Sequence, residues 1–281
     1  MPLLEKRRIE TERGDVEVFL GGTDSAAPTL CAAHPADPLG EGAVELLSAA
    51  SEARVACVSP RRPTLEEMVD DVEAVRRSLG VDRWVFWGMS GGGWLAQIYA
   101  HRHPDPLAGI IIEGACACFR ERLADPACVL SPFHPAWSAT LEAAGLLDPA
   151  SHREAGDADD TEWIEIQGVG SVFRRRNGPA LLVSPMPISD RMRRVMPALW
   201  TFDSREWLST IRVPTLVLSG TADPIVPIAH ARAVHEAIPG SRWVAVEGAG
   251  HVPVAEKRPE VREAVRSFLE DMKLTQQRLA G

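Results

Sequence analysis

Residues 85–94, VFWGMSGGGW, place one serine among four glycines directly after a run of strand-forming residues. Glycine inside a regular element costs stability, so this density of glycine indicates a backbone that needs unusual dihedral angles or close packing. Gly88, Ser90 and Gly92 match the pattern G-x-S-x-G, with an apolar strand pattern before it and a helix pattern after it. In that context the serine occupies a strained turn and its hydroxyl points away from the sheet. The stretch therefore predicts a nucleophilic Ser90 between a strand and a helix.

Strand-like and helix-like patterns alternate on both sides of this stretch. The clearest helix is predicted over 64–80, because Thr64 and Glu67 form a capping box, apolar residues recur on one face, and Gly80 supplies a stop. The expected strands are 7–13, 15–21, 28–34, 53–60, 83–88, 107–114, 213–220 and 243–248. The first two should form a hairpin that turns at Gly14-Asp15. The other expected helices are 42–51, 91–103, 229–238 and 259–273. Apolar strands that alternate with helices predict an α/β fold with a mostly parallel central sheet.

The alternation stops between Ala115 and about Glu206, where prolines, mixed charges and aromatic residues gather without a clear strand pattern. A stretch of this length is too long for a plain loop, so we expect a helical lid inserted after the strand at 107–114. The core domain then consists of residues 1–114 and 207–281, and the lid of residues 115–206. The lid aromatics, most of them expected to pack inside the lid, are Phe119, Phe133, Trp137, Trp163, Phe173, Trp200, Phe202 and Trp207.

The composition narrows the class of protein. The 281 residues are 45% hydrophobic and 25% charged, as in an ordinary globular protein, and the net charge of −9 opposes binding to nucleic acid. No run approaches the roughly 20 apolar residues of a membrane helix, and the first residues lack the apolar region of a secretory signal. The five cysteines include no C-x-x-C pair and no neighbouring histidine cluster. We therefore expect a cytoplasmic protein with reduced thiols and no metal.

A serine hydroxyl is a weak nucleophile at neutral pH, so Ser90 requires a general base and an acid that orients the base. His251 in EGAGHVP follows the last predicted strand, in a loop position unsuited to filling a core. Asp223 in SGTADPIVP follows the strand at 213–220 and completes the required order of serine, acid and histidine. Glu113, which closes the apolar strand IIIEG, is an alternative acid at the same edge of the sheet. The sequence leaves the choice between the two acids open.

A serine nucleophile also requires N–H donors for the oxyanion that forms during acyl transfer. Gly91 presents its N–H at the start of the following helix, where the helix dipole favours negative charge. The second donor should come from the loop after the strand at 28–34, where Pro35 has no N–H, so we expect Ala36 to supply it. His34, Met89 and Trp137 are our expected substrate contacts.

Three motifs, GMSGGG, GTADPIVP and GAGHVP, resemble those of the α/β-hydrolase fold family, in particular its lid-bearing esterases and lactonases. The resemblance covers about residues 1–114 and 207–281. It implies Ser90 as nucleophile, Asp223 as acid and His251 as base, without a cofactor. Serine at the nucleophile position argues against the dehalogenase and epoxide-hydrolase branches, which use aspartate there. The family commonly has His-Gly where this chain has His34-Pro35, and this departure leaves the substrate class open.

These observations support three hypotheses of different classes. The first is a serine hydrolase that cleaves an ester, lactone or thioester of a small to medium apolar metabolite through an acyl-enzyme on Ser90. The second keeps the fold but performs acyl transfer, cyclisation or carbon–carbon cleavage, because the short SPRRPT loop around Arg61 alters one wall of the pocket. The third is a ligand-binding module without turnover. The expected partner is a small-molecule substrate, with no nucleic acid and no membrane, and whether the chain forms a homodimer stays open.

Overall fold

An eight-stranded sheet with the order β1-β2-β4-β3-β5-β6-β10-β11 forms the centre of the protein. The structure is a computed structural model that describes residues 4–23, 29–152 and 159–280. The strands are β1 (Glu5–Thr11), β2 (Gly14–Gly22), β3 (Thr29–Ala33), β4 (Arg54–Ser59), β5 (Trp84–Met89), β6 (Leu107–Glu113), β10 (Thr215–Gly220) and β11 (Arg242–Val246). β2 runs antiparallel to β1 and β4, and the remaining neighbours are parallel. Their carboxyl ends therefore meet at one edge of the sheet.

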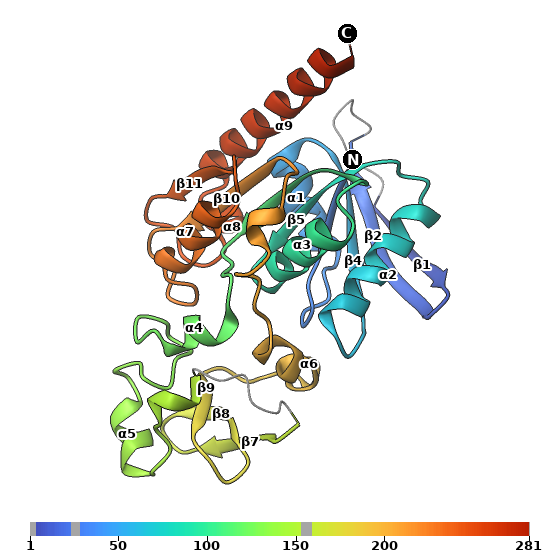
Figure 1. The fold of residues 1–281 in the computed structure, drawn as a ribbon. Helices are drawn as coiled ribbons and strands as arrows, with labels where there is room; N and C mark the ends of the chain where they lie inside the picture. The colour runs from blue at the N-terminus through green and yellow to red at the C-terminus, as the bar shows by residue number, and fades with distance from the viewer. Residues whose placement is uncertain (1–3, 24–28, 153–158, 281) are drawn as a thin grey trace.

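Helices cover both faces of this sheet (Figure 1). They are α1 (Glu41–Ser51), α2 (Leu65–Ser78), α3 (Gly91–Arg102), α7 (Ile228–Ala237), α8 (Pro253–Glu256) and α9 (Arg258–Ala280). Alternate strand residues face opposite layers: in β5, Phe86 packs in the cluster that includes α2 and α3, and Trp87 packs in the cluster that includes α1 and α9. Among the residues that the structure describes, no helix combines the length and apolar run needed to cross a membrane.

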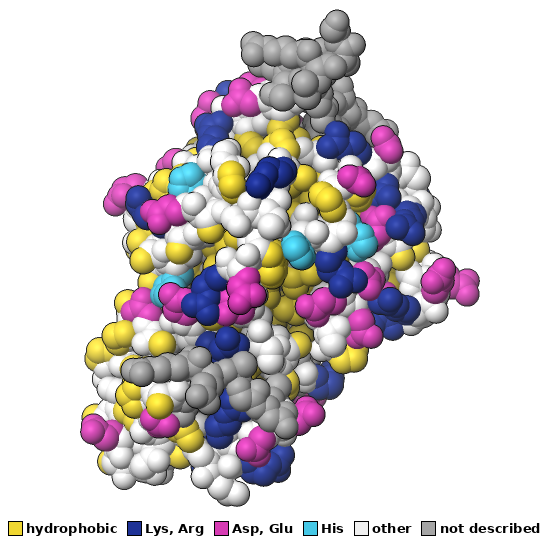
Figure 2. Space-filling view, viewed as in Figure 1, with side chains coloured by type: hydrophobic (Ala, Val, Ile, Leu, Met, Phe, Trp, Pro, Cys, Tyr) yellow, Lys and Arg dark blue, Asp and Glu magenta, His cyan; other side chains and the backbone are white. Residues whose placement is uncertain are grey.

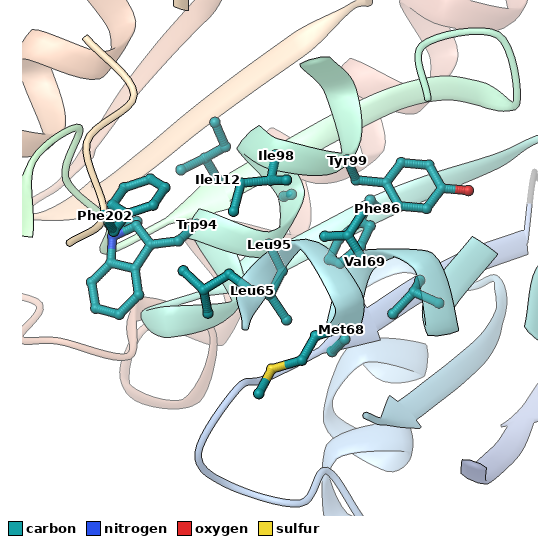
Figure 3. Packing of buried hydrophobic residues seen from close by; sticks show 14 of the residues in the cluster. Leu65, Met68, Val69, Phe86, Trp94, Leu95, Ile98, Tyr99, Ile112 and Phe202 are labelled. Carbon is teal, nitrogen blue, oxygen red and sulfur yellow. The ribbon is translucent and has the colours of Figure 1, made fainter. Parts of the chain in front are cut away.

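The packing beneath α3 fixes the start of that helix. Figure 3 shows Trp94, Leu95 and Ile98 of α3 among buried side chains of the sheet and of α2. Trp94 also lies against Phe202, in the segment that returns from the insertion, with ring centroids 5.6 Å apart. Phe119, near the start of the insertion, lies against the same Trp94 ring at 5.2 Å, so both ends of the insertion are held against the helix that begins at Ser90.

The insertion, residues 115–206, lies below the core in Figure 1, and we refer to it as the lid. It contains α4 (Phe119–Ala124), α5 (Ser138–Ala143), η1 (Pro149–His152), β7 (Thr161–Ile166), β8 (Gly170–Arg175), β9 (Ala180–Ser184) and α6 (Asp190–Trp200). The expectation of a helical lid is wrong in part, because β7, β8 and β9 form a three-stranded antiparallel sheet. These strands are only five or six residues long, and charged residues interrupt their apolar pattern, which hid them in the sequence.

A short neck, residues 117–119 and 202–204, joins the lid to the core. The Phe119 N–H donates to the Phe202 carbonyl at 3.2 Å, and the Ser204 N–H donates to the Ala117 carbonyl at 2.8 Å. Cys118 and Asp203 form an isolated β-bridge between them. The two ends of the lid therefore meet in space although more than 80 residues separate them in the sequence. A short helical turn, η2 (Leu208–Thr210), follows the neck and leads back towards the sheet.

Most core elements lie within two residues of their expected bounds. Two differ further: α9 continues to Ala280, and the first hairpin pairs Thr11 with Gly14, so that its turn consists of residues 12 and 13 rather than Gly14-Asp15. Pro28, at the start of one expected strand, lies outside the described residues.

Candidate active site

Ser90 occupies the turn between β5 and α3 with φ 51° and ψ −121°, a conformation that a non-glycine residue adopts only under constraint. Its N–H donates to the Glu113 carbonyl of β6 at 2.8 Å. The neighbouring glycines are required by space: a Cβ atom at Gly88 would lie 2.2 Å from the Gly92 carbonyl oxygen, and one at Gly92 would lie 2.3 Å from the Ala33 carbonyl oxygen. The glycines of the motif thus let strand and helix approach and leave Ser90 at the tip of the turn.

The structure brings Ser90, His251 and Asp223 into one hydrogen-bonded chain. His251 Nε2 lies 2.8 Å from Ser90 Oγ, and His251 Nδ1 lies 2.8 Å from Asp223 Oδ2. The Asp223 side chain is fully buried, and its second oxygen accepts the N–H groups of Ile225 and Val226 at 2.8 and 2.9 Å. A buried carboxylate beside Nδ1 keeps the proton on that nitrogen and leaves Nε2 free to accept the serine proton.

Glu113, the alternative acid, faces different partners. It is completely buried, and its two oxygens accept the Val254 N–H and the Trp87 indole N–H, each at 2.8 Å. Burial raises the pKa of Glu113 to about 7. The next residue, Gly114, has φ +58°, and a Cβ atom there would lie 2.9 Å from the His251 carbonyl oxygen. The structure therefore places Asp223, and not Glu113, against the histidine.

The loop after β3 differs from the expectation for Ala36. The Ala36 N–H donates to His34 Nδ1 at 3.2 Å, the Asp37 N–H donates to the same atom at 2.8 Å, and Ala36 does not lie on the cavity wall. This geometry does not support Ala36 as an oxyanion donor, because its amide donates to the histidine of its own loop. Two amides directed at Nδ1 fix the His34 proton on Nε2.

His34 itself lies beside the nucleophile turn. A Cβ atom at Gly91 would come within 2.9 Å of His34 Nε2, and both residues line the same cavity as Ser90. The pKa of His34 is lowered to about 4, mainly by burial; the charge of Asp37 opposes this shift, and Arg191 and His251 add to it. The imidazole is neutral at physiological pH and presents an N–H group towards the reaction site.

A cavity of about 350 Å³ separates Ser90 from the lid. In Figure 2, hydrophobic side chains occupy the middle of the visible face, with charged side chains around them. Lid residues on the cavity wall include Phe119, Arg122, Leu182, Met192, Met196 and Leu199. The site is thus mainly apolar, with a few polar groups, as is usual for small-molecule pockets.

Two expected substrate contacts do not lie on this wall. Met89 packs partly buried against the α1 and α9 side of the core, and Trp137 packs inside the lid with its indole N–H donating to the Ser131 carbonyl at 2.7 Å. Of the eight lid aromatics, only Phe119 lines the cavity. Within the described parts of the chain, no cluster of three or more His, Cys, Asp or Glu side chains could hold a metal.

Sequence reasoning missed Arg191, which ties the lid to the catalytic loops. From α6, its guanidinium donates to the Pro35 carbonyl at 3.2 Å and to the Pro60 carbonyl. The chain also carries Arg193 and Arg194 in this helix, and no local signal separates the three arginines. The contact arises only when the lid meets the core.

The fold and the site together define a class of hydrolase with a nucleophile at a strand–helix turn. Residues 48–151 match the family model described as alpha/beta hydrolase fold, and residues 191–279 match the model described as TAP-like protein. A probable proline iminopeptidase of Leptolyngbya boryana is 25% identical over 68% of this chain and 67% of its own length. A pimeloyl-[acyl-carrier protein] methyl ester esterase of Aromatoleum aromaticum is 28% identical over 69% of this chain and 75% of its own length.

A solved structure of an alpha/beta fold family hydrolase from Bacillus anthracis superposes with a TM-score of 0.67 at 19% identity, covering 96% of this chain and 99% of that one. The chain belongs to the α/β-hydrolase fold family and, like the relatives it matches, is a hydrolase.

Proposed function

We propose that this protein is a serine hydrolase that cleaves a carboxylic ester, lactone or thioester of a small to medium apolar compound. One observation carries the proposal: the continuous hydrogen-bonded chain from Ser90 Oγ through His251 to Asp223, located at the base of an apolar cavity. The esterase among the matched relatives supports this reaction class, and the strained backbone at Ser90 supports the role of a nucleophile.

The reaction follows from the positions of the three side chains. His251 Nε2 takes the proton of Ser90 as Oγ bonds to the substrate carbonyl carbon, whose oxygen becomes negatively charged. Asp223 stabilises the imidazolium that results. The intermediate collapses when Nε2 returns the proton to the departing oxygen or sulfur, leaving an ester on Ser90. Water, deprotonated by the same nitrogen, then releases the acid and restores the hydroxyl.

Two N–H groups stabilise the oxyanion in this proposal. Gly91 is the first residue of α3, and the first N–H groups of a helix have no acceptor inside the helix. His34 Nε2–H supplies the second donor in place of the Ala36 amide, because Nδ1 is engaged by two backbone N–H groups and Nε2 faces Gly91. A low pKa keeps the imidazole neutral, and a neutral donor avoids proton loss during the reaction.

Covalent labelling tests the proposal directly. We expect one fluorophosphonate per chain by intact mass on the wild-type protein and none on Ser90→Ala, with hydrolysis of short p-nitrophenyl esters lost in parallel. Ser78→Ala, a substitution on the exposed end of α2, serves as control and should label like wild type. A folded Ser90→Ala protein that keeps more than a few per cent of the wild-type turnover would sink the nucleophile assignment.

A further inference from the structure

Arg122 is a buried arginine on the wall of the active-site cavity. Only 2% of its surface is exposed, it lines the same cavity as Ser90, and its Nε atom has no hydrogen-bond partner. Its neighbour on α4, Arg120, contrasts with it: that guanidinium donates to the Trp200 carbonyl at 3.2 Å and pairs with Asp203 at 3.5 Å. Two arginines of one short helix thus have opposite environments.

Aromatic rings hold the Arg122 guanidinium in place. Its central carbon lies 4.5 Å from the centroid of the Phe119 ring and 5.9 Å from that of Trp94. Cation–π contacts of this kind offset part of the cost of removing a charge from water, but they supply no hydrogen-bond acceptor. A buried guanidinium without an acceptor is unfavourable, so a fixed position of this kind indicates a partner that arrives with the ligand.

The nearby acids do not neutralise this charge. Asp125, at the end of α4, pairs with His230 at 3.0 Å, and Asp203 pairs with Arg120 and Arg205. Among the residues that line the cavity, the single carboxylate is that of Asp37, which is mostly exposed and lies beside His34. Within the described residues Arg122 forms no ion pair, and the cavity therefore has a positive charge set in apolar walls.

We propose that Arg122 binds a carboxylate of the substrate at the end remote from the bond that Ser90 attacks. The inference rests on the proposed function and narrows it to short esters, lactones or thioesters that carry a second, free carboxylate. The planar guanidinium matches a carboxylate with two parallel hydrogen bonds, and the aromatic rings beside it keep that plane fixed. The same charge repels an ammonium group, so substrates with a free amino terminus are disfavoured.

The size of the cavity limits the distance between the two ends of the substrate. About 350 Å³ holds a compact molecule, at the small end of the range for ligand pockets. Because Arg122 and Ser90 are both fixed by the packing around α3, one chain length should place the ester at Ser90 while the carboxylate contacts Arg122. Shorter and longer homologues should then be cleaved more slowly.

A ratio of rates tests the proposal. Monomethyl esters of the straight-chain dicarboxylic acids from succinate to suberate are compared with methyl alkanoates of equal length, on wild type, Arg122→Gln and Arg120→Gln. We expect the wild-type kcat/KM to favour the best anionic ester by about 10- to 100-fold, as a charge-assisted hydrogen bond provides. Arg122→Gln should lose this preference and Arg120→Gln, the matched control, should keep it. An equal ratio in wild type and a folded Arg122→Gln overturns the proposal.

Binding without turnover separates this inference from the proposed function. Glutarate and adipate are titrated calorimetrically into Ser90→Ala and into Ser90→Ala with Arg122→Gln or Arg122→Lys. Binding that is lost with glutamine and partly kept with lysine supports the carboxylate site even if no ester is cleaved, in which case the hydrolase proposal fails alone. If the wild-type protein cleaves esters but dicarboxylates bind equally well with and without Arg122, the carboxylate site is overturned and the hydrolase proposal stands. If Arg122→Gln does not fold, absence of dicarboxylate binding to Ser90→Ala itself overturns the inference.

Discussion

The ends of β6 and β10 are neighbours in the sheet, and each leads to a buried carboxylate with a different set of partners. Asp223 lies three residues beyond β10, in a loop that passes the edge of the sheet, and its Oδ2 reaches His251. Glu113 is still part of β6, and it accepts hydrogen bonds from Trp87 and from the Val254 amide. Position at the active-site edge therefore does not decide the role of a carboxylate. The decisive difference is that Asp223 lies in the loop beyond the end of β10, whereas Glu113 is still within β6.

The largest expected difference between the two regions is in turnover. Asp223→Asn should lower kcat by about 10³- to 10⁴-fold, because an amide neither holds the Nδ1 tautomer nor stabilises the imidazolium. Glu113→Gln should change kcat less than about threefold, since Glu113 touches neither His251 nor the cavity wall. Ester hydrolysis measured on both purified variants makes this comparison. A loss of turnover in Glu113→Gln that equals the loss in Asp223→Asn would contradict the assignment of the acid.

A substitution between the two regions should have an intermediate effect. Gly114→Ala would place a Cβ atom 2.9 Å from the His251 carbonyl oxygen at φ +58°, so the histidine must shift. A displacement of about 1 Å at a catalytic group can cost about 100-fold, and we expect a 10- to 100-fold loss of kcat. Gly80→Ala is the matched control, because Gly80 has φ +66° but no atom near its Cβ position. If both variants keep full turnover, close packing beneath His251 is unimportant.

Replacing Glu113 by glutamine should lower the free energy of unfolding, because Glu113 accepts hydrogen bonds from two N–H groups. A carboxyl oxygen accepts an N–H whether the group is ionised or protonated, whereas the NH₂ of glutamine cannot accept one. Glu113→Gln should therefore leave either the Trp87 indole N–H or the Val254 N–H unsatisfied, at a cost of about 1–3 kcal/mol. Urea unfolding at pH 5 measures this difference in free energy. A variant as stable as wild type would mean that these two hydrogen bonds contribute nothing.

The smallest expected effect, per unit of pH, is a dependence of that difference in stability on pH. The folded protein keeps a proton on Glu113 up to a pKa of about 7, whereas the unfolded chain releases it near the model value of 4.5. Because the folded state binds more protons in this window, the contribution of Glu113 to stability falls as pH rises from 4.5 to 7. The stability gap between wild type and Glu113→Gln should shrink by about 1 kcal/mol per pH unit, so that it nearly closes or reverses between pH 5 and pH 7.

His34 acts in the opposite direction. Its pKa of about 4 in the folded protein lies below the model value of 6.5, so the unfolded chain binds the extra proton and stability falls as pH drops from 6.5 to 4. In wild type the two effects largely cancel between pH 5 and 6.5. In Glu113→Gln the His34 contribution remains alone, and the variant should gain stability as pH rises. A gap between the two proteins that is constant across unfolding curves from pH 5 to 7 would contradict the shift at Glu113.

The sequence predicts what is encoded locally. The N-cap at Thr64, the apolar strands and the glycines around Ser90 each depend on neighbours a few residues away, and the structure shows them as expected. The same local reasoning could have predicted that the Glu113 side chain points away from the cavity. Side chains alternate along β6, so Glu113 shares the face of Ile111, which packs in the cluster containing α1 and α9 and away from the cavity.

Backbone detail within a loop and contacts between distant segments were both beyond such reasoning. The Ala36 amide turns towards His34 because of the local path after Pro35, and Trp137 lies inside the lid because of a sheet whose short strands gave no clear pattern. Arg122 did carry a weak signal. In FRERLA it recurs with Phe119 and Leu123 at helical spacing, on the side of the helix that meets apolar residues. No feature of the sequence shows that this side faces Ser90.

The neck at residues 117–119 and 202–204 has a consequence for how such proteins diversify. The entropy of closing a loop grows only slowly with its length, so a neck that already holds its two ends together tolerates very different segments between them. A different lid can therefore be held between the same two neck segments, provided that it replaces the contacts of Arg191 with the Pro35 and Pro60 carbonyls. Arg122 lies just inside the neck and would be replaced together with the rest of the lid. Descendants of one ancestor could then share a reaction while each lid selects its own substrate.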